Sequence, residues 1–120
     1  MFYSWKSPWD TQSDWALASA EAREILSKVT DAKGRSFQIA EIPTAVQTRS
    51  TRDDFFFGYA NYYVGNGAVY SPHFGDQKAD SHALATLGGL FRDRAVISLE
   101  VDRIYENGGG IHCVTQQEPE

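Results

Sequence analysis

The spacing of apolar residues along the chain predicts an alternation of helices and strands. The first helix is indicated by apolar residues that recur every three or four positions: Trp15, Ala18, Ala22, Ile25, Leu26 and Val29. One of the polar residues from Asp10 to Asp14 can cap its start, and Gly34 can end it. The residues that follow alternate between polar and apolar, which predicts a strand over residues 36–42.

The second half of the chain begins with a polar segment, residues 44–54, which is either a solvated connection or a functional loop that acts as a lid or contacts a partner. Aromatic and β-branched residues then predict a strand over residues 55–64. Asn66-Gly67 predicts a tight hairpin turn, because both residues tolerate positive φ, and a return strand over residues 68–71.

A second helix and two further strands complete the predicted order. Asp76 can cap the helix, whose apolar face is formed by Ala83, Leu84, Leu87 and Leu90. Ile97, Leu99 and Val101 alternate in a strand, residues 102–110 form a turn, and residues 111–115 form a final strand. Periodicity therefore favours an α/β fold with an internal repeat of roughly 60 residues.

The composition narrows the classes of function. The chain has 120 residues, which allows one compact domain, and its formal net charge of −5 argues against nucleic acid and anionic membranes as partners. No apolar stretch approaches the roughly 20 residues of a membrane span, and the N-terminus lacks the basic-then-apolar order of a signal peptide. A single cysteine cannot form an internal disulfide, so we expect a reducing compartment, the cytoplasm.

That cysteine, Cys113, follows three consecutive glycines that begin at Gly108. Glycine lets another group approach the backbone closely, and a thiol becomes a good nucleophile where its surroundings lower its pKa. Local sequence alone favours an inert core residue, because free cysteine is among the most buried residue types. Thiol redox chemistry is the least favoured alternative, since no second cysteine is present to resolve a disulfide.

The residues around Cys113 resemble a known family. The run over residues 108–117 (GGGIHCVTQQ) resembles the C-terminal signature of the agmatine deiminases, relatives of the Porphyromonas-type peptidyl-arginine deiminases. Residues 60–76 (ANYYVGNGAVYSPHFGD), which end in a Pro-x-Phe-Gly-Asp element, and residues 90–94 (LFRDR) are also similar to that family, in the same order. The similarity is close over residues 59–118 and looser over residues 10–43.

The resemblance implies the pentein fold, a ring of five ββαβ modules around a central substrate channel. The chain is then an α/β protein with a partial pentein fold of about one and a half to two modules. Residues 1–54 are part of the penultimate module and a loop, and residues 55–120 are the final module with the nucleophile motif. An opened ring exposes sheet edges, so we expect a homodimer or a higher oligomer, with the aromatic side chains of residues 1–9 packed on the body or on a partner.

The resemblance also implies a reaction at guanidine groups. In that family a cysteine thiolate attacks the guanidinium carbon, ammonia leaves, and water hydrolyses the thiouronium adduct. For agmatine the product is N-carbamoylputrescine, a step of putrescine and polyamine biosynthesis. Cys113 aligns with the nucleophile, and Gly109 and Gly110 would let the substrate approach the backbone. We expect no cofactor and no metal, and a cationic guanidine small molecule as the partner.

The other catalytic groups of the family do not occur in this sequence. The family's histidine lies upstream in a Gly-His-x-Asp element, with carboxylates that grip the guanidinium. None of the three histidines has that context: we expect His73 in a turn, His82 on a helix surface, and His112 on the opposite face of a strand from Cys113. The chain resembles the C-terminal third of a deiminase and is expected to be inactive or weak alone. The alternative is a non-catalytic, oligomerising or ligand-binding remnant of the fold, in which Cys113 is a relic.

Overall fold

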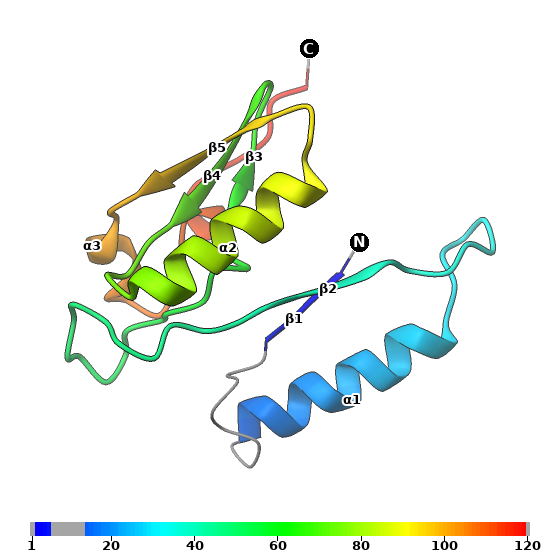
Figure 1. Cartoon of the computed structure of the whole chain (residues 1–120), viewed down its shortest axis with the longest axis horizontal. Helices are drawn as coiled ribbons and strands as arrows, with labels where there is room; N and C mark the ends of the chain where they lie inside the picture. The colour runs from blue at the N-terminus through cyan, green and yellow to red at the C-terminus, as the bar shows by residue number, and fades with distance from the viewer. Residues whose placement is uncertain (1, 6–13, 120) are drawn as a thin grey trace.

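A computed structural model describes residues 2–5 and 14–119, the first four by their backbone alone. The chain forms two βαβ units in succession (Figure 1). In the first unit, α1 (Asp14–Lys28) connects β1 (Phe2–Trp5) to β2 (Ile39–Ile42), and the two strands pair in parallel. The sequence pattern did not predict β1, and the expected packing of aromatic side chains in residues 1–9 lies outside the described side chains.

The second unit contains a three-stranded sheet in the order β3-β4-β5. Strand β3 (Tyr63–Val64) pairs antiparallel with β4 (Ala68–Pro72), and β4 pairs in parallel with β5 (Ala95–Leu99). Helix α2 (Gln77–Leu90) makes the crossover between these parallel strands and lies along one face of the sheet in Figure 1. A short helix, α3 (Asp102–Tyr105), and a 3₁₀ turn, η1 (His112–Val114), follow β5.

The α/β class, both long helices and the hairpin are confirmed. Asp76 caps α2 as predicted, because the backbone N–H of Ala79 donates to its carboxylate over 3.1 Å. Gly67 in the hairpin turn has φ of 80°, a conformation that few residues other than glycine adopt without strain. Over the described ranges, neither long helix has the length and apolarity that a membrane span requires.

The predicted strand over residues 55–64 is wrong in its extent. Only its last two residues form β3, while Phe55 and Tyr59 are buried in the core without joining a sheet. Their aromatic character reflects packing, which large rings can supply from irregular backbone as well as from a strand.

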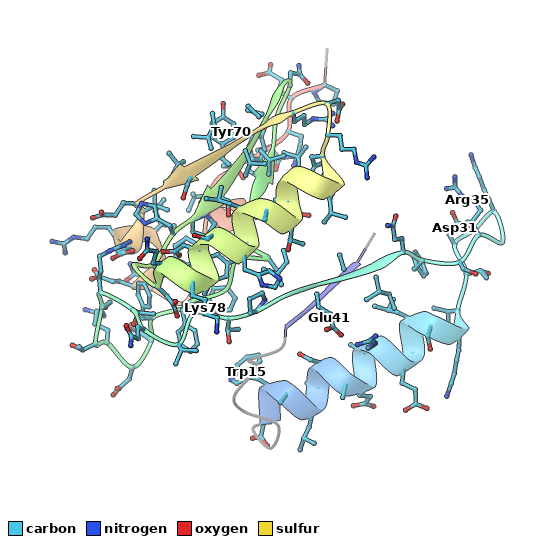
Figure 2. The ribbon with its side chains drawn as sticks, viewed as in Figure 1. Trp15, Asp31, Arg35, Glu41, Tyr70 and Lys78 are labelled. Carbon is cyan, nitrogen blue, oxygen red and sulfur yellow. The ribbon has the colours of Figure 1, made fainter. Side chains whose placement is uncertain are left out.

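The predicted end of the first helix is also wrong. Helix α1 ends at Lys28, before Gly34 is reached. Gly34, with φ of 75°, lies instead in a turn that is closed by the ion pair of Asp31 with Arg35 (Figure 2). The glycine therefore serves a tight turn that leads into β2.

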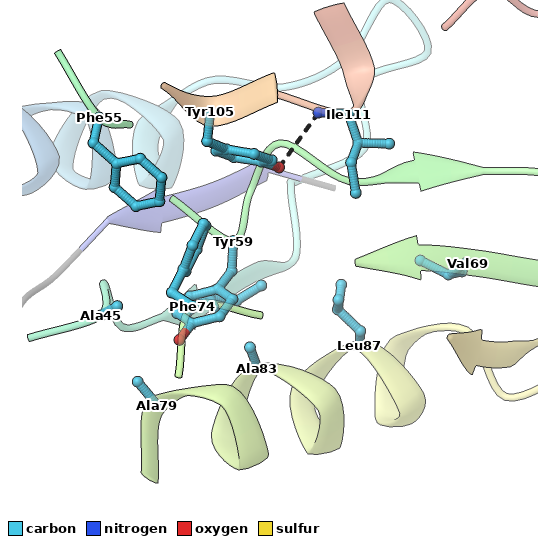
Figure 3. Close-up of a cluster of buried hydrophobic side chains, with 11 residues drawn as sticks. Ala45, Phe55, Tyr59, Val69, Phe74, Ala79, Ala83, Leu87, Tyr105 and Ile111 are labelled. Atoms are coloured by element: carbon cyan, nitrogen blue, oxygen red, sulfur yellow. Dashed lines mark hydrogen bonds between the residues drawn. The ribbon is translucent and has the colours of Figure 1, made fainter. Parts of the chain in front are cut away.

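The core lies between α2 and the segments that face it (Figure 3). Ala79, Ala83 and Leu87 are the buried residues of α2. Their partners are Val69 of β4, Ile42, Ala45 and Ile111, and four aromatic residues, Phe55, Tyr59, Phe74 and Tyr105. Fully burying a large apolar side chain, such as Leu87 or Phe74, stabilises the folded state by about 1.5–3 kcal/mol relative to leaving it exposed. The rings make edge contacts, with 5.1 Å between the centroids of Phe74 and Tyr105.

Helix α1 is packed differently from α2, because none of its residues is buried. Trp15, at the start of the helix (Figure 2), is 71% exposed, Leu17 is 59% exposed and Ile25 is 53% exposed. Towards β2 the helix presents small and charged side chains around a gap of about 270 Å³, which is bridged by the ion pair of Arg23 with Glu41. The predicted apolar face exists, but it is not covered by the described part of this chain.

Candidate active site

Cys113 lies in the middle of η1, the 3₁₀ turn that is the last regular element among the described residues. The backbone N–H of Cys113 donates to Gly110 O over 3.1 Å, and the N–H of Thr115 donates to His112 O over 3.3 Å. The hydroxyl of Thr115 also donates to Ile111 O over 3.0 Å. The predicted strand over residues 111–115 is therefore wrong, because these carbonyls bond within the turn and not to a neighbouring strand.

The sulfur of Cys113 is exposed, which contradicts the alternative that it is an inert core residue. Its described hydrogen-bond partner is the side-chain amide of Asn61, which donates from Nδ2 over 3.3 Å. That bond, followed by a contact with the backbone of Gly110, holds the pKa of Cys113 below its usual value. A depressed thiol pKa raises the fraction of thiolate, which is the nucleophilic form.

Asn61 bonds to the turn through both ends of its amide. The backbone N–H of His112 donates to Asn61 Oδ1 over 2.7 Å. A backbone N–H can only donate, so the amide oxygen must face it, and the amide nitrogen consequently faces the sulfur of Cys113. The orientation of this amide is thus set by the hydrogen bonds themselves.

A buried tyrosine ties Asn61 to the residues before the turn. The hydroxyl of Tyr105 donates to the backbone carbonyl of Asn61 over 2.7 Å and accepts from the N–H of Ile111 over 3.4 Å. Figure 3 shows the second of these bonds. Burial raises the pKa of Tyr105 far above its ordinary value, so the hydroxyl remains protonated and keeps its donor.

The two glycines predicted to bind substrate have different surroundings. A Cβ at Gly110 would lie 2.5 Å from Cγ of Asn61, so the absence of a side chain at this position makes room for the asparagine amide. A Cβ at Gly109 would lie 3.6 Å from Cβ of Cys113 and 3.8 Å from its sulfur, which is ordinary contact. The structure explains Gly110 by packing, and it leaves the role of Gly109 towards substrate as a prediction.

The structure does not pair a histidine imidazole with the thiol among the interactions it describes. His82 is exposed on α2 as predicted, and His73, directly after β4, accepts from Arg49 through its backbone carbonyl. His112 precedes Cys113 in a 3₁₀ turn, where neighbouring side chains diverge by about 120°, so the expected opposite faces of a strand do not apply. Within residues 2–5 and 14–119, no cluster of three or more histidine, cysteine or acidic residues suited to a metal is found.

Sequence reasoning missed Asn61. It belongs to the stretch of residues 60–76 that resembles the deiminases, but it lies 52 positions from Cys113 and carries no spacing signal that links the two. Only the folded arrangement, in which the start of the hairpin lies beside the C-terminal turn, brings its amide to the sulfur.

Comparisons with known proteins show which family the chain resembles. Residues 2–119 match the family model of the Porphyromonas-type peptidyl-arginine deiminases. The agmatine deiminase of Medicago truncatula is 35% identical over 120 aligned residues, which cover 84% of this chain and 32% of that protein. The solved agmatine deiminase of Enterococcus faecalis superimposes with a TM-score of 0.83 at 26% identity, over 98% of this chain and 36% of that one.

This chain therefore spans about a third of the length of the relatives it matches. Its structural neighbours are agmatine and arginine deiminases, which have the pentein fold, so the fold expected from the resemblance is supported at that level. The chain belongs to the Porphyromonas-type peptidyl-arginine deiminase family.

Proposed function

We propose that this chain supplies the nucleophile of a guanidine deiminase. The observation that carries the proposal is the state of Cys113: an exposed thiol with a lowered pKa, in a turn that a neighbouring amide holds in place. We favour agmatine, a cationic alkylguanidine, as the substrate, because relatives of this chain are named agmatine deiminase.

The reaction consists of two successive substitutions at the guanidinium carbon. The thiolate of Cys113 forms a C–S bond to that carbon, and the C–N bond to one terminal nitrogen breaks as the nitrogen takes a proton and leaves as ammonia. Water then adds to the thiouronium carbon, the C–S bond breaks, and the thiolate is regenerated. With agmatine the product is N-carbamoylputrescine. These steps need a proton donor, a base for the water and carboxylates for the cationic substrate.

We infer that those groups come from residues outside this sequence. The described hydrogen-bond partner of the sulfur is an asparagine amide, which does not exchange protons near neutral pH as an imidazole does. The sequence contains no Gly-His-x-Asp element. In this proposal residues 55–120 form the final module with the nucleophile, residues 1–54 form part of the preceding module and a loop, and the chain alone deiminates agmatine weakly or not at all. The cytoplasmic location and the role in polyamine synthesis remain predictions.

A second candidate is a non-catalytic function in oligomerisation. It is favoured by α1, whose side chains Trp15, Leu17 and Ile25 are more than half exposed, because large apolar groups on one helix are typical of surfaces that another chain covers. The two candidates differ in what they require of Cys113, since an oligomerising remnant places no demand on the thiol.

The proposal is tested by ammonia release from millimolar agmatine with the purified chain and with Cys113→Ala. We expect at most slow release, abolished by Cys113→Ala. Rapid Cys113-dependent release by the monomer would show that the site is complete and overturn the inferred need for outside residues. Slow release that is equal in both proteins would remove Cys113 from the chemistry.

A further inference from the structure

We propose that β5 is a self-association edge, at which two copies of this chain pair antiparallel about a two-fold axis through Ile97. The partner is a second copy of the chain, and the product is one continuous sheet in the order β3-β4-β5-β5-β4-β3. The inference depends on the sheet alone and goes beyond the proposed function, because it makes no use of the chemistry of Cys113.

Strand β5 lies at an edge of its sheet, and its outer backbone groups point away from that sheet. The strand order is β3-β4-β5, so within the described residues β5 pairs on one side only, with β4 (Figure 1). The N–H of Ala95 donates to Gly67 O over 3.0 Å. In a parallel pair alternate residues bond to the neighbouring strand, so the odd-numbered residues of β5 face β4. The N–H and C=O groups of Val96 and Ser98 are therefore directed outward.

The sequence of β5 lacks the features by which edge strands avoid pairing. Exposed edges usually carry a lysine, a proline or a bulge. The five residues of β5 are Ala-Val-Ile-Ser-Leu, with no charged residue, no proline and no glycine, and their register with β4 is unbroken. A regular apolar edge of this kind is a template for another strand.

The charges at the two ends of β5 favour an antiparallel partner of the same sequence. Arg94 lies three residues before Ile97, and Glu100 lies three residues after it. When two copies pair antiparallel with Ile97 opposite Ile97, Arg94 of each copy lies opposite Glu100 of the other. Opposite charges in such cross-strand positions are stabilising, whereas a parallel pair in register would place like charges side by side.

The same register also satisfies the backbone. It places Val96 of one copy opposite Ser98 of the other, and these are the residues whose N–H and C=O groups point outward, so they can exchange hydrogen bonds. Ile97 then meets its own counterpart in a non-hydrogen-bonded pair, where the side chains lie closest. Ile97 is 38% exposed in the single chain, so the pairing covers an apolar side chain.

A row of apolar and aromatic side chains leads across the sheet to this axis. Val96 lies against Gly88 of α2, so Ile97 faces the opposite side of the sheet. Ile97 is in register with Tyr70, and Tyr70 with Tyr63, whose ring it stacks on at 6.2 Å. Figure 2 shows Tyr70 on the side away from α2. Pairing about Ile97 joins this row to the same row of the second copy.

A cross-link at the axis tests this arrangement. A non-hydrogen-bonded antiparallel pair has Cα atoms about 4.5 Å apart, which a disulfide can bridge without movement of the backbone. Ile97→Cys is made in a chain that carries Cys113→Ala, so that the new thiol is the only one. Thr51→Cys, in an exposed loop of the same background, is the control for random collision. Under mild oxidation Ile97→Cys should form a covalent dimer roughly tenfold faster or more, and equal rates would overturn the inference.

Sedimentation velocity tests the edge without a cross-link. Ile97→Lys brings two like charges together at the axis and should raise the dissociation constant of the dimer by roughly tenfold or more. Thr51→Lys is the matched control and should change nothing. Both are made in an Ile25→Glu background, so that contacts through α1 do not contribute. If this background sediments as a monomer at about 100 μM, β5 is left to a different chain and the inference is wrong. The cross-link decides the matter if Ile97→Lys does not fold.

The register has its own test in the charges at the ends of the strand. Glu100→Arg creates a like-charge pair with Arg94 of the other copy and should weaken the dimer. Arg94→Glu combined with Glu100→Arg reverses both charges and should restore the association. A double variant that remains as weak as Glu100→Arg alone would contradict the antiparallel register.

Discussion

Gly110 lies against Asn61 so closely that a Cβ at position 110 would be 2.5 Å from Cγ and 2.7 Å from Nδ2 of the asparagine. The last of three glycines and a residue from the start of the hairpin thus share one small space. Two hydrogen bonds of the Cys113 turn depend on that space, since the amide of Asn61 bonds both the N–H of His112 and the sulfur of Cys113.

Gly110→Ala should therefore disturb the turn through packing. Alanine must displace the asparagine amide or the backbone of the turn, which costs about 1–3 kcal/mol in the free energy of unfolding. Gly109→Ala is the matched control, because its Cβ would make only ordinary contacts. Urea denaturation of both variants checks this. Equal stability of the two would show that the close approach has no energetic consequence.

Arg49 anchors the polar loop over residues 44–54 to the body of the fold. Its guanidinium donates to both carboxylate oxygens of Asp102, over 2.8 and 2.7 Å, and to the carbonyl of His73 over 2.6 Å. The side chains of this pair are 31% and 18% exposed, so the pair is partly screened from solvent. The loop is consequently tied down, in contrast to a purely solvated connection.

Arg49→Lys should destabilise the chain by about 1 kcal/mol, because lysine keeps the charge but loses the two-pronged contact. Arg52→Lys in the same loop is the control. The pair of Arg52 with Asp54 is exposed to solvent, so Arg52→Lys should leave the free energy of unfolding nearly unchanged. Thermal or urea unfolding of both variants measures the difference, and a larger effect at Arg52 would contradict this ranking.

Asp76 should make stability depend on acid pH. Burial alone would raise the pKa of Asp76, but hydrogen bonds from the backbone N–H groups of Val46, Ala79 and Gln47 outweigh burial and hold it below the ordinary value of 3.8. A group whose pKa is lower in the folded state stabilises that state above its unfolded pKa, and this contribution is lost as the pH falls through the folded pKa.

Asp76→Asn should therefore cost about 1 kcal/mol at neutral pH. The difference from the wild type should shrink at pH values below about 4. Urea unfolding of both proteins at pH 7 and at acid pH gives the two differences. A difference that stays constant, or that grows as the pH falls, would show that the carboxylate is not the stabilising form.

The exposed face of α1 should promote self-association at micromolar concentration. Ile25→Glu places a charge beside Ala22 and Val29 on that face, and should shift the distribution in sedimentation velocity towards monomer. Thr51→Glu adds the same charge at an exposed loop position and should leave the distribution unchanged. A wild-type chain that sediments only as a monomer would refute the predicted oligomer.

The features that could be predicted from the sequence are those whose causes lie within a few residues. Asp76 caps α2 by accepting a hydrogen bond from the N–H of Ala79, only three residues further along the chain. Gly67 supplies the positive φ of its own turn. The conformation around Cys113 depends instead on Asn61, 51 positions from the N–H of His112. Apolar alternation suggested a strand there, because neither the distant amide nor the bond from Thr115 to Ile111 leaves a trace in local periodicity.

The candidate site was predictable to a similar degree. Cys113 could be identified from the residues around it, whereas its exposure and its donor could not. For α1 the pattern correctly predicted a helix with an apolar face, but the direction in which that face points depends on what packs against it. Within the described residues that face is open.

Transplantation into a complete relative shows whether Cys113 acts as a deiminase nucleophile. In the agmatine deiminase of Enterococcus faecalis, the segment that superimposes on this chain is replaced by residues 2–119, and ammonia release from agmatine is measured. We expect the chimaera to release ammonia, and Cys113→Ala to lower its rate by roughly a thousandfold or more. A folded chimaera that releases no ammonia, or whose activity survives Cys113→Ala, would contradict it.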